Sequence, residues 1–319
     1  MNHKKPLVTV ICICHNQANY VEECLQSVYA QTYSNIELIV VDNGSTDGSQ
    51  AVIAKVIKPN TLYFPLDDNI GMCAAFNKGL AHAKGKYIIN LAADDVLMPA
   101  KIELQVLFFE QQDSNTGVIF SDALLIDENS KPLKTFYKRN NQNQLLTTVP
   151  EGYIYEHLLR HYTVSSPTLM VRKSVYDEIG GLDESLVYED YDFYVRTGKK
   201  YKYMFQNEVL IKKRISAGSA SSLFYRPKEN PFLQSTLIVL NKATRIITEE
   251  AEKKSLIYSI RYHMRQSLYM QLPKLVEEYY ALLRTLILPS VVDRIIYILS
   301  KIPFPYYEVY KVYRKCRVW

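Results

Sequence analysis

The chain has 319 residues, of which 48% are hydrophobic and 22% are charged, and its formal net charge is +5. This length suits one large α/β domain with an appendage, or two modest domains, and the composition predicts a sizeable packed core rather than a disordered chain. No apolar stretch reaches about 18 residues, and the start lacks the apolar core of a signal peptide, so we expect neither a membrane span nor a secreted protein.

The positive charge is concentrated near the carboxyl end. From residue 281 onward there are seven basic and two acidic residues, so the first 280 residues are neutral overall. This distribution predicts a surface contact at the tail and no nucleic-acid binding by the body.

The first 121 residues alternate between apolar runs typical of buried strands and amphipathic stretches typical of helices. The predicted strands cover residues 7–14, 36–41, 62–66, 87–91 and 117–121, and the predicted helices cover 20–30, 49–57, 71–83 and 99–112. Short connections between them predict a doubly wound, mostly parallel sheet, with ligands beyond the carboxyl ends of its strands.

The rest of the chain is less regular and then helical. Residues 127–165 are polar and are interpreted as a variable loop over the site, followed by a strand at 168–171 and a helix over 190–199. We expect one domain over 1–226, with halves of about 1–122 and 123–226, and a helical extension over 227–319.

The five cysteines indicate an intracellular protein. Four of them lie in apolar runs, and Cys12 and Cys14 form a C-x-C inside a predicted strand. That pattern favours reduced thiols in the core over a zinc site or a disulfide framework.

Acidic residues at two predicted strand ends are the first candidates for a site. Asp42 begins a turn-rich loop and, taken alone, is explained better by the turn than by a function. Asp94 and Asp95 lie too far before Pro99 to be a simple helix cap, and two adjacent carboxylates repel each other unless a divalent cation compensates them. Glu189 and Asp190, taken alone, also fit an ordinary acidic pair at a helix start.

Five ordered blocks of sequence can be taken together: PLVTVICICHN (6–16), VVDNGSTD (40–47), NIG, AA, NKG and AKGKYI within 69–88, LAADD (91–95) with Pro99, and GGLDE (180–184) followed by ED (189–190). Together they resemble glycosyltransferase family 2 over about residues 6–221. In order, they look like its first strand, its uridine-binding loop, its third block, its metal-binding motif, and its acceptor loop with the catalytic-acid region.

The resemblance implies a GT-A fold, a nucleotide-diphosphate-sugar donor, Mn²⁺ or Mg²⁺, and inversion at the anomeric carbon. On the donor side, it implies that Asp42 holds the uracil ring, Asp94 holds the metal, and Asp95 supports that metal or the sugar. Asn77 and Lys78 lie in a block associated with the nucleotide, and Arg214 resembles a late arginine that approaches the diphosphate.

On the acceptor side, the resemblance implies that Asp190 is the general base. Gly181, Asp183 and Glu189 belong to the matching acceptor region. A carboxylate is suited to the role because an acceptor hydroxyl is a poor nucleophile until its proton is removed.

Three positions depart from the family pattern. Asn43 stands where the family often has a second Asp, Ala92 replaces the first Asp of the usual Asp-x-Asp, and Ser216 stands where His is common. The Asp94–Asp95 pair is therefore left to carry the metal, and diphosphate contacts rest more on Arg214 and the metal.

The resemblance implies a hexosyl- or hexosaminyltransferase. From the resemblance and the basic tail, we expect it to act on a glycan or lipid-linked glycan in bacterial surface-polysaccharide assembly. A sugar nucleotidyltransferase is the rival enzyme, but His15-Asn16-Gln17 follows the first strand in place of a Gly-rich phosphate loop. A non-catalytic binding or scaffold protein is the rival from another class, and loss of the acidic pairs would mark it. The motifs distinguish neither uracil from thymine nor one sugar or acceptor from another.

Apolar residues at helical spacing over 282–299 predict amphipathic helices in the tail. Packing on the catalytic domain, a homodimer contact and peripheral contact with an anionic membrane through 281–319 are the alternatives. Beyond 303, aromatic and basic residues interleave, which suits a bilayer surface. We therefore expect a cytoplasmic protein that can lie at the inner face of the cell membrane.

Overall fold

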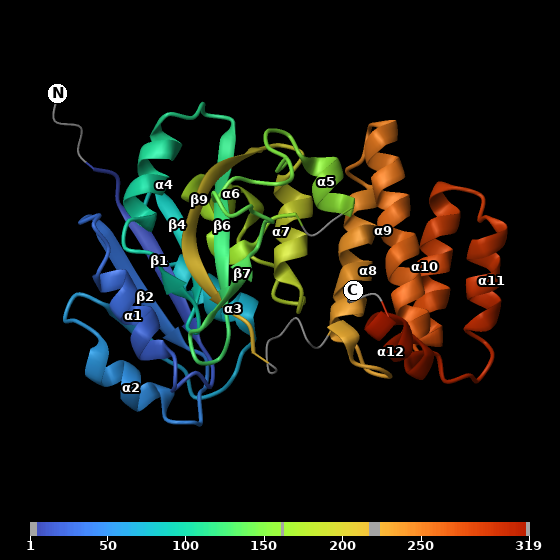
Figure 1. Ribbon diagram of the computed structural model, residues 1–319, viewed down its shortest axis with the longest axis horizontal. Helices are drawn as coiled ribbons and strands as arrows, with labels where there is room; N and C mark the ends of the chain where they lie inside the picture. Colours follow the sequence, from blue (N-terminus) through green and yellow to red (C-terminus); the bar gives the residue numbers. More distant parts are fainter. Residues whose placement is uncertain (1–4, 161–162, 217–223, 317–319) are drawn as a thin grey trace. The chain divides into compact units, whose positions relative to one another are not determined.

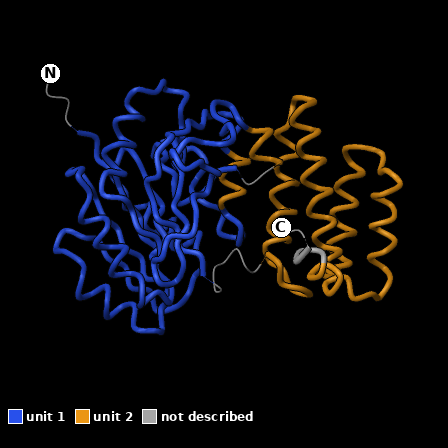
Figure 2. The backbone as a smooth tube through the Cα atoms, in the orientation of Figure 1, with its two compact units in different colours: residues 1–154, 162–189, 197–216 blue, residues 155–161, 190–196, 217–319 orange. Residues whose placement is uncertain are grey.

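The computed structural model describes residues 5–160, 163–216 and 224–316, which belong to two compact units (Figures 1 and 2). The first unit contains residues 1–154, 162–189 and 197–216, and the second contains 155–161, 190–196 and 217–319. The chain therefore passes between the units several times before the helical tail begins.

The first unit is built on a mixed sheet of nine strands in the described residues, in the order β3-β2-β1-β4-β8-β6-β9-β5 with β7 beside β6. The four strands β3, β2, β1 and β4 are parallel, and β8 is antiparallel to both β4 and β6. The strands are β1 (Val8–Cys14), β2 (Ile36–Asp42), β3 (Leu62–Pro65), β4 (Tyr87–Ala92), β5 (Val96–Leu97), β6 (Thr116–Ile126), β7 (Pro132–Thr135), β8 (Met170–Arg172) and β9 (Lys202–Arg214).

Helices connect the parallel strands as the sequence predicts. They are α1 (Val21–Tyr29), α2 (Ser49–Val56), α3 (Met72–Leu80) and α4 (Lys101–Glu110), followed later by the 3₁₀ turn η1 (Ser166–Thr168) and α6 (Lys173–Ile179). This arrangement confirms the predicted α/β class with its mostly parallel sheet.

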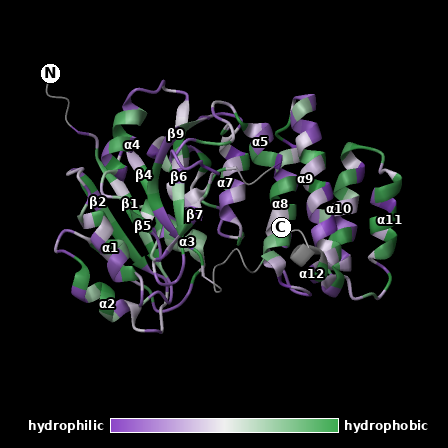
Figure 3. Ribbon diagram, viewed as in Figure 1, coloured by the Kyte–Doolittle hydropathy of each residue, from purple (hydrophilic) through white to green (hydrophobic). Residues whose placement is uncertain are grey.

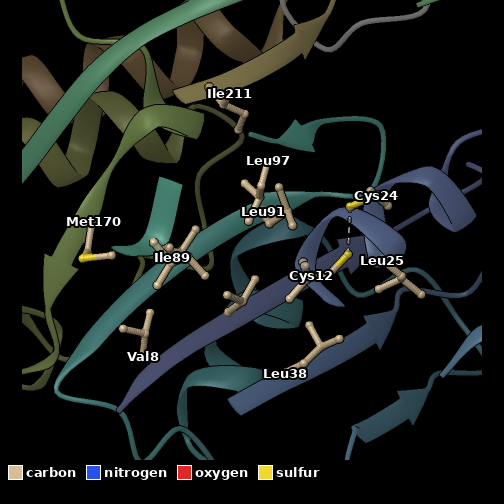
Figure 4. Packing of buried hydrophobic residues seen from close by; sticks show 14 of the residues in the cluster. Val8, Cys12, Cys24, Leu25, Leu38, Ile89, Leu91, Leu97, Met170 and Ile211 are labelled. Carbon is tan, nitrogen blue, oxygen red and sulfur yellow. Dashed lines mark hydrogen bonds between the residues drawn. The ribbon is translucent and has the colours of Figure 1, made fainter. Parts of the chain in front are cut away.

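The core of this unit lies between the sheet and the helices that flank it (Figure 4). Every residue of β1 is buried, and its alternate side chains Val8, Val10 and Cys12 pack with Cys24 and Leu25 of α1. The sulfur atoms of Cys12 and Cys24 are 3.8 Å apart, and Cys12, Cys14, Cys24 and Cys73 are all buried free thiols. The interpretation of these cysteines as core residues is confirmed.

The second unit is helical. It contains α5 (Tyr155–Arg160), most of α7 (Glu189–Thr197), α8 (Pro231–Thr244), α9 (Glu250–Tyr269), α10 (Pro273–Leu286), α11 (Val291–Leu299) and α12 (Tyr306–Cys316). Leu233, Leu240, Ile260 and Leu283 are fully buried between these helices. Within the described ranges, none of the helices is long and apolar enough to cross a bilayer.

The structure differs from the sequence prediction mainly after residue 121. The region 127–165, interpreted as a loop, contains β7 and α5, and the predicted strand at 117–121 continues to Ile126. The long strand β9 has no counterpart among the predicted elements. Residues 155–161 and 190–196 group with the helical unit, whereas the predicted boundary lies at residue 226.

Candidate active site

The carboxyl ends of β1, β2 and β4 meet at one edge of the sheet. Cys14 pairs with Asp42, and Ile13 pairs with Ala92, so the loops that follow these strands begin side by side. The Asn43 amide donates to the Cys14 carbonyl at 2.7 Å, and the Ala93 amide donates to the Ile13 carbonyl at 3.0 Å. This register places Asp42 and the Asp94–Asp95 pair at the same edge.

Asp42 is fully buried, and only one of its two carboxylate oxygens accepts hydrogen bonds from the described residues. Its Oδ1 accepts from the Ser45 amide at 2.9 Å and from Gln50 Nε2 at 3.0 Å, which fixes the orientation of the carboxylate. Its Oδ2 is also buried and has no hydrogen-bond partner among the described residues. Since a buried acceptor is costly to leave unpaired, Oδ2 is suited to accept an N–H group from a ligand.

The loops after β1 and β2 are joined by hydrogen bonds. Asn16, which has a left-handed φ of 54°, donates from its amide to the Ser45 hydroxyl at 2.9 Å, and its Oδ1 accepts from the Thr46 amide at 2.8 Å. The Ala18 amide donates to Asp47 Oδ2 at 3.0 Å. These contacts hold the backbone around Asp42 in one shape without any ligand.

Asn43 joins the same edge to the loop after β3. Its Nδ2 donates to Asn69 Oδ1 at 2.9 Å, and its Oδ1 accepts from the Ile70 amide at 2.9 Å. His15 completes the network, because its Nδ1 donates to the Asn43 carbonyl at 2.8 Å and its Nε2 accepts from Asn69 Nδ2 at 3.1 Å. A carboxylate in place of Asn43 has no proton to donate to Asn69, which gives this departure from the family pattern a physical reason.

Burial and mutual repulsion disfavour ionisation of the Asp94–Asp95 pair. Burial raises the pKa of Asp94, and burial together with the charge of Asp94 raises the pKa of Asp95 to about 8. The Arg214 backbone amide donates to Asp95 Oδ1 at 2.9 Å and so holds one of the two carboxylates in place.

The two carboxylates fit a divalent cation that is shared with a substrate. Mg²⁺ and Mn²⁺ prefer oxygen ligands, and Mg²⁺ often takes one or two carboxylates plus substrate phosphates. No cluster of three or more His, Cys, Asp or Glu residues arranged for a metal occurs in the described part of the chain. An ion at Asp94 and Asp95 would need further oxygen ligands from outside this pair, and the role of the pair as metal ligands stays a prediction.

Arg214, at the end of β9, supports the backbone of this pair. Its side chain is buried, and its Nε donates to the Asp94 carbonyl at 3.0 Å. The other nitrogens contact the Glu23 carboxylate at 2.9 Å, the Ser130 hydroxyl at 3.0 Å and the Asp127 carbonyl at 3.0 Å. A direct contact with a diphosphate would require one of these partners to be exchanged, so the geometry favours Arg214 as support for the turn that carries Asp94.

The structure places Asn77 against the predicted acceptor loop. Its Nδ2 donates to the Leu182 carbonyl at 2.8 Å and to Glu184 Oε1 at 2.9 Å, while its Oδ1 accepts from the Leu182 amide at 2.9 Å. The predicted nucleotide contact of Asn77 stays a prediction. The neighbouring Lys78 extends over the ring of Phe64, with its Nζ 5.1 Å from the ring centroid.

The acceptor loop begins with two glycines that have positive φ. Gly180 has a φ of 71° and ends α6, and Gly181 has a φ of 82° beside Asn77. A Cβ atom on Gly181 would lie 2.5 Å from Asn77 Oδ1, so only glycine fits there. Asp183 is engaged locally, because its Oδ1 accepts from both the amide and the hydroxyl of Ser185.

Glu189 and Asp190 begin α7, as the sequence predicts for an acidic helix start. Glu189 closes one segment of the first unit, and Asp190 opens a segment of the second. The role of Asp190 as the base stays a prediction.

Four residues that support the site are not among the predicted site residues. Gln50 and Asn69 orient the loop around Asp42, and Glu23 and Ser130 hold Arg214. Glu23 is in the first turn of α1, where an acidic residue has an ordinary explanation, so only the fold reveals its partner.

Comparison with known proteins identifies the family. The model of glycosyl transferase family 2 matches residues 9–178, more than half of the chain. The chain belongs to this family. An uncharacterised glycosyltransferase of Rickettsia prowazekii is 32% identical over 225 residues, which cover 69% of this chain and 68% of that protein. Among its relatives are five rickettsial glycosyltransferases, and the chain spans 31% to 68% of their lengths.

A Bacillus subtilis relative, TuaG, is named as a putative teichuronic acid biosynthesis glycosyltransferase. It is 29% identical over 175 residues, which cover 54% of this chain and 64% of TuaG.

Solved structures show the same fold at lower identity. S. aureus TarS 1–349 in complex with UDP-GlcNAc has a TM-score of 0.66 and 18% identity, covering 97% of this chain and 92% of that one. The mannosyltransferase PcManGT from Pyrobaculum calidifontis, in complex with GDP-Man and Mn²⁺, has a TM-score of 0.60 and 18% identity, covering 96% and 83%. The predicted GT-A fold with C-terminal helices is confirmed.

Proposed function

We propose that this family 2 member transfers a hexosyl or hexosaminyl group from a uridine diphosphate sugar to an acceptor hydroxyl, with inversion at the anomeric carbon. The observation that carries the proposal is the sheet edge where an oriented, buried Asp42 with an unpaired oxygen lies beside the strand that delivers Asp94 and Asp95. A nucleobase edge and a diphosphate-bound cation are the ligands that suit these two features.

Recognition of the base is assigned to Asp42. Its Oδ2 accepts a ring N–H of uracil, while Ser45 and Gln50 hold the other oxygen. Because Ser45 and Gln50 already hold the Asp42 carboxylate before the base binds, its side chain loses little conformational freedom on binding. The S. aureus structure with UDP-GlcNAc supports a uridine donor for this chain by analogy of fold.

Stabilisation of the negative charge on the leaving diphosphate is assigned to the Asp94 and Asp95 site. When bound there, Mn²⁺ or Mg²⁺ neutralises the negative charge that develops on the leaving oxygens. Asp94 and Asp95 hold the ion, and Arg214 fixes the turn between β4 and β5 that presents them. Mn²⁺ in the P. calidifontis mannosyltransferase supports this assignment.

Removal of the proton from the acceptor hydroxyl is assigned to Asp190. A carboxylate at a helix start is kept ionised by the helix dipole, and it can take the hydroxyl proton as the oxygen attacks the anomeric carbon. The carbon–oxygen bond to the nucleotide diphosphate breaks as the new glycosidic bond forms. The loop held by Asn77 and Gly181 is assigned to the acceptor side.

The acceptor that we propose is a glycan or lipid-linked glycan in the assembly of a bacterial surface polysaccharide. The name of the B. subtilis relative supports this context. The rival interpretation, a binding or scaffold protein without activity, is tested by the same experiment as the donor.

The experiment is slow donor hydrolysis in the absence of an acceptor. UDP-, dTDP- and GDP-sugars are incubated with the protein and Mn²⁺, and the release of nucleotide diphosphate is followed. We expect release from a UDP-sugar, its loss in excess chelator, and its recovery with Mn²⁺ or Mg²⁺. Asp94→Asn should abolish release with little change in melting temperature, whereas Asp177→Asn, an exposed surface carboxylate, should behave as wild type. If the protein binds a nucleotide but neither hydrolyses any donor nor transfers a sugar to any glycan, the result would favour the scaffold interpretation.

A further inference from the structure

One side of α11 and its flanking turns is a strip of exposed aliphatic side chains in the second unit. The ribbon of α11 is coloured mostly as hydrophobic in Figure 3. We call this strip of side chains the α11 strip. Its members and their exposed fractions are Leu288 86%, Val291 72%, Val292 60%, Ile295 48%, Ile298 58% and Ile302 49%. Six exposed aliphatic residues in one strip are unusual on a surface that contacts only water. Contiguous apolar patches of this kind mark interaction sites.

The strip is a continuous face rather than a scatter of residues. An α-helix advances about 100° per residue, so positions 291, 292, 295 and 298 fall within an arc of about 120°. Leu288 and Ile302 extend the same exposed surface just before and just after the helix. The other side of α11 carries Asp293 and Ile296, both buried.

Asp293 prevents α11 from turning this face inward. Its Oδ2 accepts from Arg261 Nη2 of α9 at 2.7 Å and from the Ser290 hydroxyl at 2.8 Å. Burial opposes ionisation of Asp293, but these bonds outweigh it and lower the pKa of the carboxyl. The ion pair and the capping box therefore lock the helix with its aliphatic side outward.

Basic residues border the strip. Arg294 lies on the helix about 60° from the line of Val291, and exposed Arg284 lies in the last turn of α10. Lys301 follows the helix and pairs with Glu277 at 2.7 Å. Arg284 and Arg294 have no carboxylate within ion-pair distance among the described residues. The two acids after residue 280 are already neutralised, because Asp293 pairs with Arg261 and Glu308 pairs with Lys311 at 2.7 Å.

We propose that the α11 strip docks on the surface of an anionic phospholipid bilayer. Aliphatic side chains enter the boundary between headgroups and acyl chains to a depth of about 5–10 Å, while bordering arginines contact lipid phosphates. The excess of five positive charges in residues 281–319 complements such a surface. Phe304, which is 49% exposed beyond the strip, is one of the apolar residue types found on the membrane-facing side of interfacial helices.

The charge pattern favours a bilayer over a second copy of the chain. In a two-fold dimer the same patch faces itself, so a patch bordered by Arg284 and Arg294 would meet a patch of the same positive charge. The inference concerns the helical unit alone and does not depend on the donor chemistry proposed for the first unit.

The test is sedimentation with vesicles of phosphatidylcholine and vesicles in which part of that lipid is replaced by phosphatidylglycerol. We expect the wild type to pellet with the anionic vesicles and to bind neutral vesicles at least about tenfold more weakly. The triple variant Val291→Ser/Ile295→Ser/Ile298→Ser should lower anionic binding by about tenfold or more, because each change removes aliphatic surface. Arg284→Gln/Arg294→Gln should weaken anionic binding by about tenfold and leave neutral binding unchanged.

The matched control is Leu107→Ser/Leu133→Ser/Ile238→Ser, which removes exposed aliphatic side chains away from α11. It should bind vesicles as wild type does. Melting temperature and donor hydrolysis should be retained by all three variants, which separates loss of docking from unfolding or a failed active site. No pelleting of the wild type with anionic lipid, or equal pelleting of the α11 triple variant, overturns the proposal. A dimer in sedimentation equilibrium that the triple variant dissociates, without vesicle binding, also overturns it and assigns the strip to a second copy.

Discussion

Gly181 and Asn77 approach each other so closely that no side chain larger than hydrogen fits between them. Gly181→Ala adds a Cβ 2.5 Å from Asn77 Oδ1 at a φ of 82°, so the Asn77 side chain, the loop or α3 must move and the hydrogen bonds of Asn77 are disturbed. We expect a loss of stability of about 1–3 kcal/mol and a larger fall in sugar transfer than in donor hydrolysis. Thermal unfolding and paired transfer and hydrolysis assays measure both effects.

Gly180→Ala is the control, because Gly180 also has a positive φ but no atom lies within 4 Å of the place that an added Cβ would take. Its cost should therefore come from backbone strain alone. If the two variants lose stability and transfer equally, the contact with Asn77 does not position the acceptor loop.

Asp190→Asn tests the general base while keeping the shape and the capping ability of the side chain. We expect turnover to fall by about 10²–10⁴-fold, with nucleotide binding and melting temperature little changed. Glu189→Gln is the neighbouring control and should retain most activity. Near-normal transfer by Asp190→Asn with an inactive Glu189→Gln would reverse the two roles.

At the site, the sequence predicts which residues lie at the strand ends better than it predicts which residues contact one another. The motifs around Asp42 and Asp94 identify strand ends, because carboxyl ends of parallel strands share one edge. They do not reveal that Asn77 uses its amide to hold Leu182 and Glu184, since those partners lie more than 100 residues away. Arg214 is a similar case, because its partners come from α1 and from the loop after β6.

Among the elements, the parallel half of the sheet follows directly from the sequence, whereas the later strands do not. The predicted strands and helices up to residue 112 match β1–β4 and α1–α4 within a few residues, because each has a clear apolar period. In contrast, β9 has many half-exposed polar residues. Its pairing register with β6 shifts at several points, including near Ser121 and Asp122. Its strand structure depends on pairing with β6, which no local pattern encodes.

The buried Lys101 of α4 gives a prediction at this scale. Its Nζ donates to Gln105 Oε1 at 2.8 Å and to the Thr168 carbonyl at 3.1 Å, which ties α4 to η1. Burial lowers the pKa of Lys101 from 10.5 to about 7. Because the unfolded lysine keeps its ordinary pKa, unfolding takes up a proton between about pH 7 and 10.5, and this group makes stability rise with pH across that window.

Lys101→Met should remove this contribution. We expect the free energy of unfolding to rise with pH more steeply in the wild type than in the variant, by up to about 1.4 kcal/mol per pH unit between about pH 7 and 9. Urea unfolding at several pH values across that range measures the slopes, and the exposed Lys84→Met serves as control. Parallel slopes for wild type and Lys101→Met would show that the buried amine does not titrate in this range.

At the scale of the whole molecule, the helical unit is interlaced in sequence with the catalytic chain rather than simply appended to it. Two of its segments, 155–161 and 190–196, precede the tail by many residues. Tyr191 of α7 donates from its hydroxyl to the Leu159 carbonyl at 2.9 Å and contacts the Ser259 hydroxyl at 3.2 Å. Asp192 is fully buried and pairs with Arg196 and with Lys242 of α8, each at 2.6 Å.

These contacts predict that a fragment ending at residue 226 does not keep the stability of the full chain. Removing α8 and α9 takes Lys242 and Ser259 away from their partners and exposes the buried Leu158 and Leu159 to water. Exposed aliphatic side chains and a weakened ion pair should make the fragment aggregate or unfold at a lower temperature. Size-exclusion chromatography and thermal unfolding compare the fragment 1–226 with the full chain. A monodisperse fragment that melts at the temperature of the full chain and hydrolyses donor at the same rate would show instead that the tail is an independent appendage.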